Sequence, residues 1–304
     1  MGSTLSNPIV DKNTTENILQ QNDLIFVSSS MQGWRIKMED VHIIENNIPN
    51  FPDYSFFGVY DGHLGRETSE YLGENLHLNI FKKIHEVGEE NIEKAIKDAF
   101  MQTDSDWNVK SDSGYSGSTA VIAIKTPNDI VYIGNAGDSR AVMSVAGLAI
   151  PLSEDHKPSV EREAQRIIQV GGDPHGVNLT RAFGNFKKWK NNPNKGPEEQ
   201  IIIALPDINS HKIDTETDFL VLACDGIWDC MSSQRVIDFI IKDIKLNKDL
   251  SKACENLMDR CLSKEGRGVG TDNMTIIIVG FLHGLEKEKW LERISNRCIN
   301  EENN

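Results

Sequence analysis

Three aspartates stand beside short apolar runs that lie far apart in the chain. Asp61 and Asp225 each follow such a run and precede a glycine, and Asp272 comes just before a third run. The runs are residues 56–60, 219–224 and 274–279. Runs of this length rich in Val, Ile and Phe predict buried strands, so we expect the carboxylates at the rim of a core, where an unpaired charge is costly. Oxygen ligands without nearby Cys or His pairs suit a hard divalent cation such as Mg²⁺ or Mn²⁺ better than Zn²⁺.

The two Asp-Gly pairs also have a simpler interpretation. Asp-Gly after a strand is one of the commonest turn signals, because glycine readily adopts a positive φ angle. Taken singly, each pair is better explained as a turn. Three carboxylates at strand ends, one of them followed by His63, favour a shared metal site over separate turns.

The composition limits the classes of function. The 304-residue chain carries a formal net charge of −14 at pH 7, so we expect no nucleic-acid partner, because nucleic-acid binders normally present a basic surface. No stretch approaches the roughly 20 apolar residues that span a bilayer, and the N-terminus lacks a secretory pattern, which predicts an intracellular protein, cytoplasmic with the nucleus as the alternative. Five cysteines without a C-x-x-C pair fit reduced thiols better than disulfides. Cys224 is expected in the core, with a nucleophilic thiol as the minor alternative.

The N-terminal segment carries a separate signal. Residues 1–24 are polar and rich in Asn, which predicts a flexible segment. Met1-Gly2-Ser3-Thr4-Leu5-Ser6 fits the template for N-myristoylation, and Met-Gly-Ser is equally a frequent remnant of recombinant expression, so both interpretations stay open. A single myristoyl chain would give only weak membrane association.

The intervening chain predicts strands and helices that could position the aspartates. Residues 119–124 and 130–133 flank a Pro- and Asn-containing reversal and predict a hairpin, which residues 141–145 would continue as a meander. Helical spacing appears at Ile92, Ala95, Ile96, Ala99 and Phe100, at Val236, Phe239, Ile240 and Ile244, and at Ala253, Leu257 and Cys261. Strands grouped in hairpins with helices in pairs predict an α+β fold of antiparallel sheets covered by helices.

A further motif leads to a family resemblance. In Gly33–Asp40 an arginine, Arg35, stands four residues before Glu39, and an arginine fork suits phosphate oxygens. This motif, GWRIKMEDVH, is the first of an ordered set along the chain. The motifs that follow it are FFGVYDGHLG, SGSTA, GNAGDSRAV, EDHKPS, LTRAFGN, GPEEQIIIALPDI, FLVLACDGIWD and GTDNMTIIIV. The ordered set spans about residues 27–283 and closely resembles the metal-dependent protein serine/threonine phosphatases of the protein phosphatase 2C family.

The resemblance implies a fold and a ligand set. It implies a central antiparallel β-sandwich flanked on both sides by pairs of antiparallel helices, in one catalytic domain at residues 25–284. The amphipathic spacing of Trp290, Leu291 and Ile294 separately predicts a short helix and tail at residues 285–304. The resemblance also implies two Mn²⁺ or Mg²⁺ ions in a cleft at one end of the sandwich. Asp61 would bridge both ions, and the other ligands would be Asp225 and Asp272 for one ion and Glu39 with the Gly62 carbonyl for the other. Asp138 matches a residue linked to a third, weaker ion shared with Asp225. Asp40 would support the metal ligands. The alternative interpretation, that Asp40 is a surface acid capping the next strand, remains open.

The chemistry expected from this resemblance is hydrolysis of phosphoserine and phosphothreonine in proteins. A phosphomonoester dianion repels hydroxide, and two cations can both neutralise it and activate water. We therefore expect direct in-line attack by metal-bound hydroxide, without a phosphoenzyme. Arg35 would hold the phosphate and His63 would protonate the departing oxygen, whereas His156 is assigned a structural hydrogen bond. We expect phosphorylated proteins as substrates and a monomeric enzyme.

Some positions depart from the family pattern. The connection at residues 173–178 is short, Asn185 stands where the family usually has aspartate, and Leu64 is bulkier than usual. The basic loop at residues 187–196 is interpreted first as a solvated connector and second as a surface for acidic or phosphorylated substrates. Two other functions stay open, a catalytically silent docking module and a two-metal phosphoesterase acting on small phosphates or cyclic nucleotides.

Overall fold

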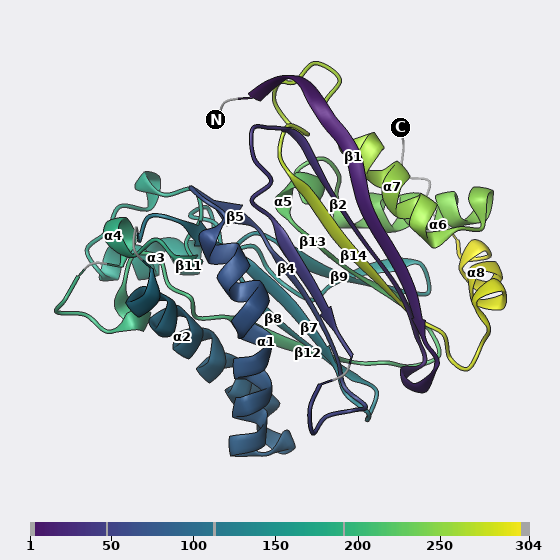
Figure 1. Cartoon of the computed structure of the whole chain (residues 1–304), viewed down its shortest axis with the longest axis horizontal. Helices are drawn as coiled ribbons and strands as arrows, with labels where there is room; N and C mark the ends of the chain where they lie inside the picture. Colours follow the sequence, from purple (N-terminus) through teal and green to yellow (C-terminus); the bar gives the residue numbers. More distant parts are fainter. Residues whose placement is uncertain (1–3, 47, 112–113, 191, 299–304) are drawn as a thin grey trace.

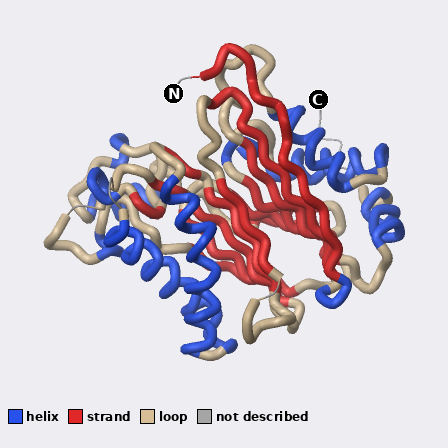
Figure 2. The backbone as a smooth tube through the Cα atoms, in the orientation of Figure 1, coloured by secondary structure: helices blue, strands red, loops and turns tan. Residues whose placement is uncertain are grey.

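The computed structural model describes residues 4–46, 48–111, 114–190 and 192–298, and within these residues two large antiparallel β-sheets lie face to face. Helices cover the outer face of each sheet (Figure 1), and the strands form the centre of the molecule (Figure 2). The predicted α+β sandwich with flanking helices is therefore confirmed. None of the helices in these ranges has an apolar stretch long enough to cross a membrane.

The first sheet contains β1 (Thr4–Leu19), β2 (Leu24–Arg35), β9 (Arg140–Val145), β10 (Leu148–Pro151), β13 (Thr217–Ala223) and β14 (Met274–Phe281). Its strand order is β1-β2-β14-β13-β9-β10. The second contains β3 (Val41–Glu45), β4 (Ser55–Tyr60), β7 (Ala120–Lys125), β8 (Ile130–Ala136) and β12 (Asp207–Lys212), in the order β12-β8-β7-β4-β3. A small sheet beside them joins β5 (Gly62–His63), β6 (Gly117–Ser118) and β11 (Phe183–Gly184).

The long helices pack in groups on the outer faces. The second sheet is covered by α1 (Glu67–Val87) and α2 (Ile92–Lys110), and the first by α6 (Ser233–Asn247), α7 (Leu250–Cys261) and α8 (Lys287–Ser295). Shorter helices lie in the connections: α3 (Glu161–Gln169), α4 (Phe186–Trp189) and α5 (Asp225–Trp228). The three helical segments predicted from apolar spacing are confirmed as α2, α6 and α7, and the predicted C-terminal helix as α8. Residues 299–304 of the predicted tail lie outside the described residues.

The alternation of side chains in β13 explains why its sequence is apolar throughout. Leu220 and Leu222 face the core between the sheets, whereas Phe219 and Val221 face the core under α6 and α7. A strand covered on both faces has no solvent side, so polar residues do not alternate with apolar ones. The same reasoning applies to β14, every residue of which is buried.

One expected strand connection is wrong. The hairpin is confirmed as β7 and β8, but residues 141–145 do not continue its meander, because β9 pairs with β13 and β10 in the other sheet. The chain crosses between the sheets at residues 137–139, where Gly137 has a positive φ of 123°. Apolar alternation shows that a segment is a strand and does not show which sheet it joins.

The expectation of a flexible N-terminal segment at residues 1–24 is also wrong for the part that the structure describes, residues 4–24. Thr4–Leu19 forms β1, an edge strand paired with β2 along most of its length. Several of its half-buried side chains are polar and bond to neighbouring elements: Lys12 Nζ lies 2.6 Å from Asp259 Oδ1, and Glu16 pairs with Lys287. Because polar contacts replace apolar ones, hydrophobic periodicity does not reveal this strand. Residues 1–3 of the myristoylation motif lie outside the described residues.

Candidate metal centre

A pocket of about 730 Å³ collects every site residue predicted from the sequence. They are Arg35, Glu39, Asp61, Gly62, His63, Asp138, Asp225 and Asp272. Asp61 follows β4, Asp225 follows β13, and Asp272 lies two residues before β14. The antiparallel arrangement therefore brings strand ends from distant parts of the sequence to one end of the sandwich.

The glycines of the two Asp-Gly pairs do not form the turns that such pairs commonly form. Neither Gly62 nor Gly226 has a positive φ angle; Gly62 begins β5 and Gly226 lies in α5. A Cβ atom on Gly226 would clash with the backbone carbonyl of Asn273. The turn interpretation is wrong for both pairs, and Gly226 serves the close approach between the segments that carry Asp225 and Asp272.

Arg35 and Asp272 face each other across neighbouring strands. Arg35 ends β2, which pairs with β14 so that Met31 lies opposite Met274. The Arg35 guanidinium donates to the Asp272 carboxylate, and both side chains remain partly exposed to the pocket. A guanidinium has five N–H donors, so Arg35 can hold this carboxylate and still donate to a phosphate oxygen.

Asn273 holds the loop that carries Glu39, a role that sequence reasoning missed. Its Oδ1 accepts a hydrogen bond from the backbone N–H of Glu39 at 2.9 Å, and its Nδ2 donates to the carbonyls of Gln32 and Lys37 at 2.8 and 3.0 Å. These bonds join the loop after β2 to the start of β14, and they leave the Glu39 side chain at the pocket. The position of Asn273 directly after the predicted metal ligand Asp272 is the sequence feature that could have indicated this role.

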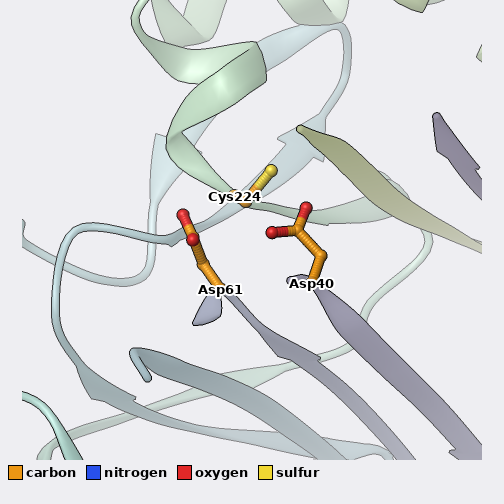
Figure 3. Close-up of side chains that lie close together, drawn as sticks. All are labelled: Asp40, Asp61 and Cys224. Carbon is orange, nitrogen blue, oxygen red and sulfur yellow. The ribbon is translucent and has the colours of Figure 1, made fainter. Parts of the chain in front are cut away.

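Asp40 and Asp61 form a buried cluster with Cys224. Their side chains point toward one another (Figure 3), and one ligand atom from each lies within 4.8 Å of the others. Burial raises the pKa of Asp40 to about 6, although Thr275 Oγ1 donates to it at 2.7 Å. Asp40 is only 3% exposed, so its interpretation as a surface acid is wrong. Burial also raises the pKa of the Cys224 thiol, which is therefore neutral and lies in the core as expected.

Negative charge also gathers at Asp225 and Asp138. Burial, then the neighbouring carboxylates, raise the pKa of Asp225 well above its usual value. Burial raises the pKa of Asp138 as well, against the opposing effect of the Lys157 ammonium. Lys157 Nζ lies 3.6 Å from Asp138 Oδ2 and 3.6 Å from Asp229 Oδ1. The Lys157 ammonium therefore already offsets part of the negative charge beside Asp138.

The donor set fits a hard divalent cation. Burial raises the pKa of Asp61, and the charges of Asp40, Asp225, Asp138 and Asp272 raise it further, so the protein itself leaves this carboxylate short of positive charge. Carboxylate and carbonyl oxygens are the ligands that Mg²⁺ and Mn²⁺ prefer, and the neighbouring sulfur is a neutral thiol. Glu39, Asp61, Gly62, Asp225 and Asp272 could hold such ions.

His63 lies at the pocket wall beside Asn185. Its Nε2 is 2.9 Å from Asn185 Oδ1. Burial lowers the pKa of His63, and the hydrogen bond to Asn185 partly opposes this shift. His156 has the expected structural role, because its Nδ1 accepts from the Gly137 N–H at 3.1 Å and its Nε2 lies 3.1 Å from Asp207 Oδ2.

The short connection at residues 173–178 and the basic loop at residues 187–196 both border the pocket. The short connection at 173–178 contains a single 3₁₀ turn, Pro174–Gly176, and residues 176–179 line the pocket. Lys188 and Trp189 of the basic loop also line it. Lys190 is buried and pairs with Asp104 at 2.7 Å, so the interpretation of residues 187–196 as a solvated connector is wrong at this position.

Comparisons with known proteins place the chain in a family. The sequence model for protein phosphatase 2C matches residues 25–268. The chain belongs to the protein phosphatase 2C family. A protein phosphatase 2C homolog 2 of Hypocrea jecorina is 44% identical over 99% of this chain and 72% of its own length. A probable protein phosphatase 2C of Caenorhabditis elegans is 45% identical over 93% of this chain and 81% of its own length.

Solved structures agree with this protein phosphatase 2C fold. A phosphatase from Toxoplasma gondii has a TM-score of 0.75 at 24% identity, covering 89% of this chain and 96% of its own. The serine-threonine phosphatase 2C from the same organism has a TM-score of 0.68 at 20% identity, covering 91% and 98%. The family is one of metal-dependent protein serine/threonine phosphatases, and this chain is a protein phosphatase.

Proposed function

We propose that this phosphatase hydrolyses phosphoserine and phosphothreonine in proteins with two bound Mn²⁺ or Mg²⁺ ions and without a phosphoenzyme intermediate. The observation that supports the proposal most is the pocket, into which carboxylates from five separate segments converge beside an arginine and a histidine. Such a pocket brings together carboxylates that can bind cations, a guanidinium that can donate hydrogen bonds to phosphate, and an imidazole that can transfer a proton.

The ligand roles follow from where the carboxylates lie. Asp61 is surrounded by the charges of the other pocket aspartates, which suits a ligand shared between two ions. Asp225 and Asp272 stand on the segments joined at Gly226 and would complete one ion. Glu39 and the Gly62 carbonyl would hold the other. Asp138 would contribute to a third ion with Asp225, and the Lys157 ammonium beside it would make that ion the weakest.

The side chains around these ligands would carry out the remaining steps. When bound, the two ions would neutralise the phosphate and lower the pKa of a shared water. Arg35 would donate to phosphate oxygens and fix the phosphorus in line with the attacking water. His63 would give a proton to the departing serine or threonine oxygen. No side chain becomes phosphorylated in this scheme.

The substrates we propose are phosphorylated proteins, and the enzyme would act as a cytoplasmic monomer. The net charge of −14 would disfavour nucleic acid. If Gly2 is myristoylated, one acyl chain would add only weak, reversible membrane association.

The proposal is tested with a phosphothreonine peptide and Mn²⁺. We expect phosphate release by the wild-type chain and at least a hundredfold lower rate for Asp61→Asn. In ¹⁸O-labelled water, one labelled oxygen should enter the phosphate in a single turnover, and acid quenching should trap no phosphorylated protein. Equal rates for the wild type and Asp61→Asn would overturn the metal-ligand assignment. Hydrolysis of cyclic nucleotides in preference to phosphopeptides would favour a different phosphoesterase, and an inactive wild type that binds no Mn²⁺ would favour a docking module.

A further inference from the structure

The side chain of Asn185 contacts His63 within the wall of the pocket. His63 Nε2 and Asn185 Oδ1 are 2.9 Å apart, and both residues line the pocket. Asn185 is 2% exposed although it lies beside an open site. The contact joins residues 122 positions apart in the sequence, so it depends on the tertiary fold.

The small sheet at this end of the molecule creates that contact. His63 of β5 lies opposite Gly117 of β6, and Gly184 of β11 lies opposite the same glycine. A Cβ atom on Gly117 would clash with both Asn185 Oδ1 and His63 Nε2. The imidazole therefore reaches across a strand position that has no side chain, and it meets the residue that directly follows β11.

The orientation of the Asn185 amide is fixed by a second hydrogen bond. Asn185 adopts the left-handed conformation, with φ 59°, and its backbone N–H donates to the Ser116 carbonyl at 2.9 Å. Its Nδ2 donates to the Tyr115 carbonyl at 3.0 Å. A carbonyl only accepts, so Nδ2 faces Tyr115 and Oδ1 faces His63. Because Oδ1 also only accepts, the proton on Nε2 belongs to His63.

The segment that carries Asn185 is held by a buried ion pair. The N–H of Gly184 donates to Asp104 Oδ1 at 2.8 Å, and Lys190 Nζ bonds to Asp104 Oδ2 at 2.7 Å and to the Ala182 carbonyl at 2.8 Å. These contacts tie the residues on both sides of Asn185 to α2. The amide thus stands on a rigid support, as a positioning group requires.

We propose that Asn185 is a positioning residue for His63, because it holds the imidazole as the Nε2–H tautomer and leaves Nδ1 as the nitrogen that transfers the proton. This inference rests on the proposed function. As water bonds to phosphorus and the P–O ester bond breaks, the bonding pair stays on the serine or threonine oxygen, which takes the proton from Nδ1 of the imidazolium. The neutral ring keeps its other proton on Nε2, where Asn185 accepts it.

Substrates with different leaving groups distinguish a role of Asn185 in proton transfer from a purely structural role. Departure of a threonine alkoxide needs a proton donor, whereas p-nitrophenolate leaves readily without one. For Asn185→Gly, which the left-handed backbone accepts, we expect kcat on a phosphothreonine peptide to fall about 10- to 100-fold and kcat on p-nitrophenyl phosphate to change less than about threefold. Asn185→Asp keeps an acceptor for Nε2–H and should retain most of the peptide activity.

Two controls complete the experiment. In a His63→Ala background, Asn185→Gly should cause no further loss on the peptide. Asn50→Gly alters another left-handed asparagine, with φ 66°, which lines a different pocket, and should leave both rates unchanged. Nitrogen-15 NMR of His63 should show protonated Nε2 in the neutral ring of the wild type and a mixture of tautomers in Asn185→Gly.

The outcomes distinguish the inference from the proposed function. Equal losses on both substrates, a further loss in the His63→Ala background, or a wild-type ring protonated on Nδ1 would each overturn the role of Asn185. A wild type that hydrolyses neither substrate would instead refute the proposed function, and the NMR tautomer would still decide whether Asn185 orients His63.

Discussion

Replacing Asp61 with asparagine should make the metal-free protein more stable. Ligand atoms of Asp61 and Asp40 lie within 4.8 Å of each other. Two unit charges at that separation repel by about 3.5 kcal/mol at an effective dielectric constant of about 20. The wild type bears this cost either as repulsion or as proton uptake, and a neutral amide avoids both. After allowing for burial of the amide, we expect a gain of about 2 kcal/mol in the free energy of unfolding.

Thermal unfolding by circular dichroism provides the assay. In EDTA, a gain of about 2 kcal/mol should raise the Tm of Asp61→Asn by about 3 °C for a chain of this size. Adding Mn²⁺ should stabilise the wild type, by about 2.7 kcal/mol per site at a hundredfold excess over Kd. The variant should respond by less than about 1 kcal/mol, because its shared ligand is weakened.

An exposed aspartate supplies the matched control. Asp98 on α2 pairs with Lys94 at the surface, so Asp98→Asn should change the unfolding free energy by less than about 1 kcal/mol and leave the Mn²⁺ response intact. The reasoning is refuted if Asp61→Asn is less stable than the wild type in EDTA, or if Mn²⁺ stabilises both proteins equally.

Other substitutions test the surrounding structure. Arg35→Lys, which loses the planar fork, should lower kcat/KM on a phosphopeptide about 10- to 100-fold in steady-state assays; an unchanged value would exclude Arg35 from phosphate binding. Burial raises the pKa of Glu163, but the hydrogen bond and charge of Arg181 outweigh it and lower the pKa from 4.5 to about 2. Its stabilisation is therefore present above pH 4.5 and lost as the pH falls toward 2. Glu163→Gln should cost about 3 kcal/mol at pH 7 in denaturant unfolding, with the difference from wild type shrinking below pH 4.5; a pH-independent difference would contradict this sign. Lys190→Met should cost about 3 to 5 kcal/mol because it strands the Asp104 carboxylate, and adding Asp104→Leu should recover most of it; no recovery would show that the ion pair is not the cause.

The parts of the fold that sequence predicts best are those set by apolar spacing. The stripe beginning at Ile92 gave α2, and the uninterrupted run before Asp225 gave β13, because burial on one or both faces leaves a direct mark on residue type. Asp61, Asp225 and Asp272 were predicted for a related physical reason, whereas most of the other site residues rest on the family resemblance. Carboxylates at the ends of buried strands are costly, so their presence in the sequence already indicates a ligand.

The parts that sequence missed depend on contacts between distant residues or on polar pairing. β1 is held by backbone bonds and by pairs such as Lys12 with Asp259, which apolar patterns do not record. The membership of β9 in the other sheet is decided by a crossing at Gly137. Asn273 and Asn185 act through amide hydrogen bonds to partners that only the folded chain brings near.

The central claim is that Asp61 joins two divalent ions in this pocket. It is tested most directly by anomalous diffraction at the manganese absorption edge from crystals soaked in Mn²⁺. The account predicts two strong peaks within coordination distance of the Asp61 carboxylate, one near Asp225 and Asp272 and one near Glu39. Peaks confined to the protein surface, or an ion in the pocket that does not contact Asp61, would contradict it.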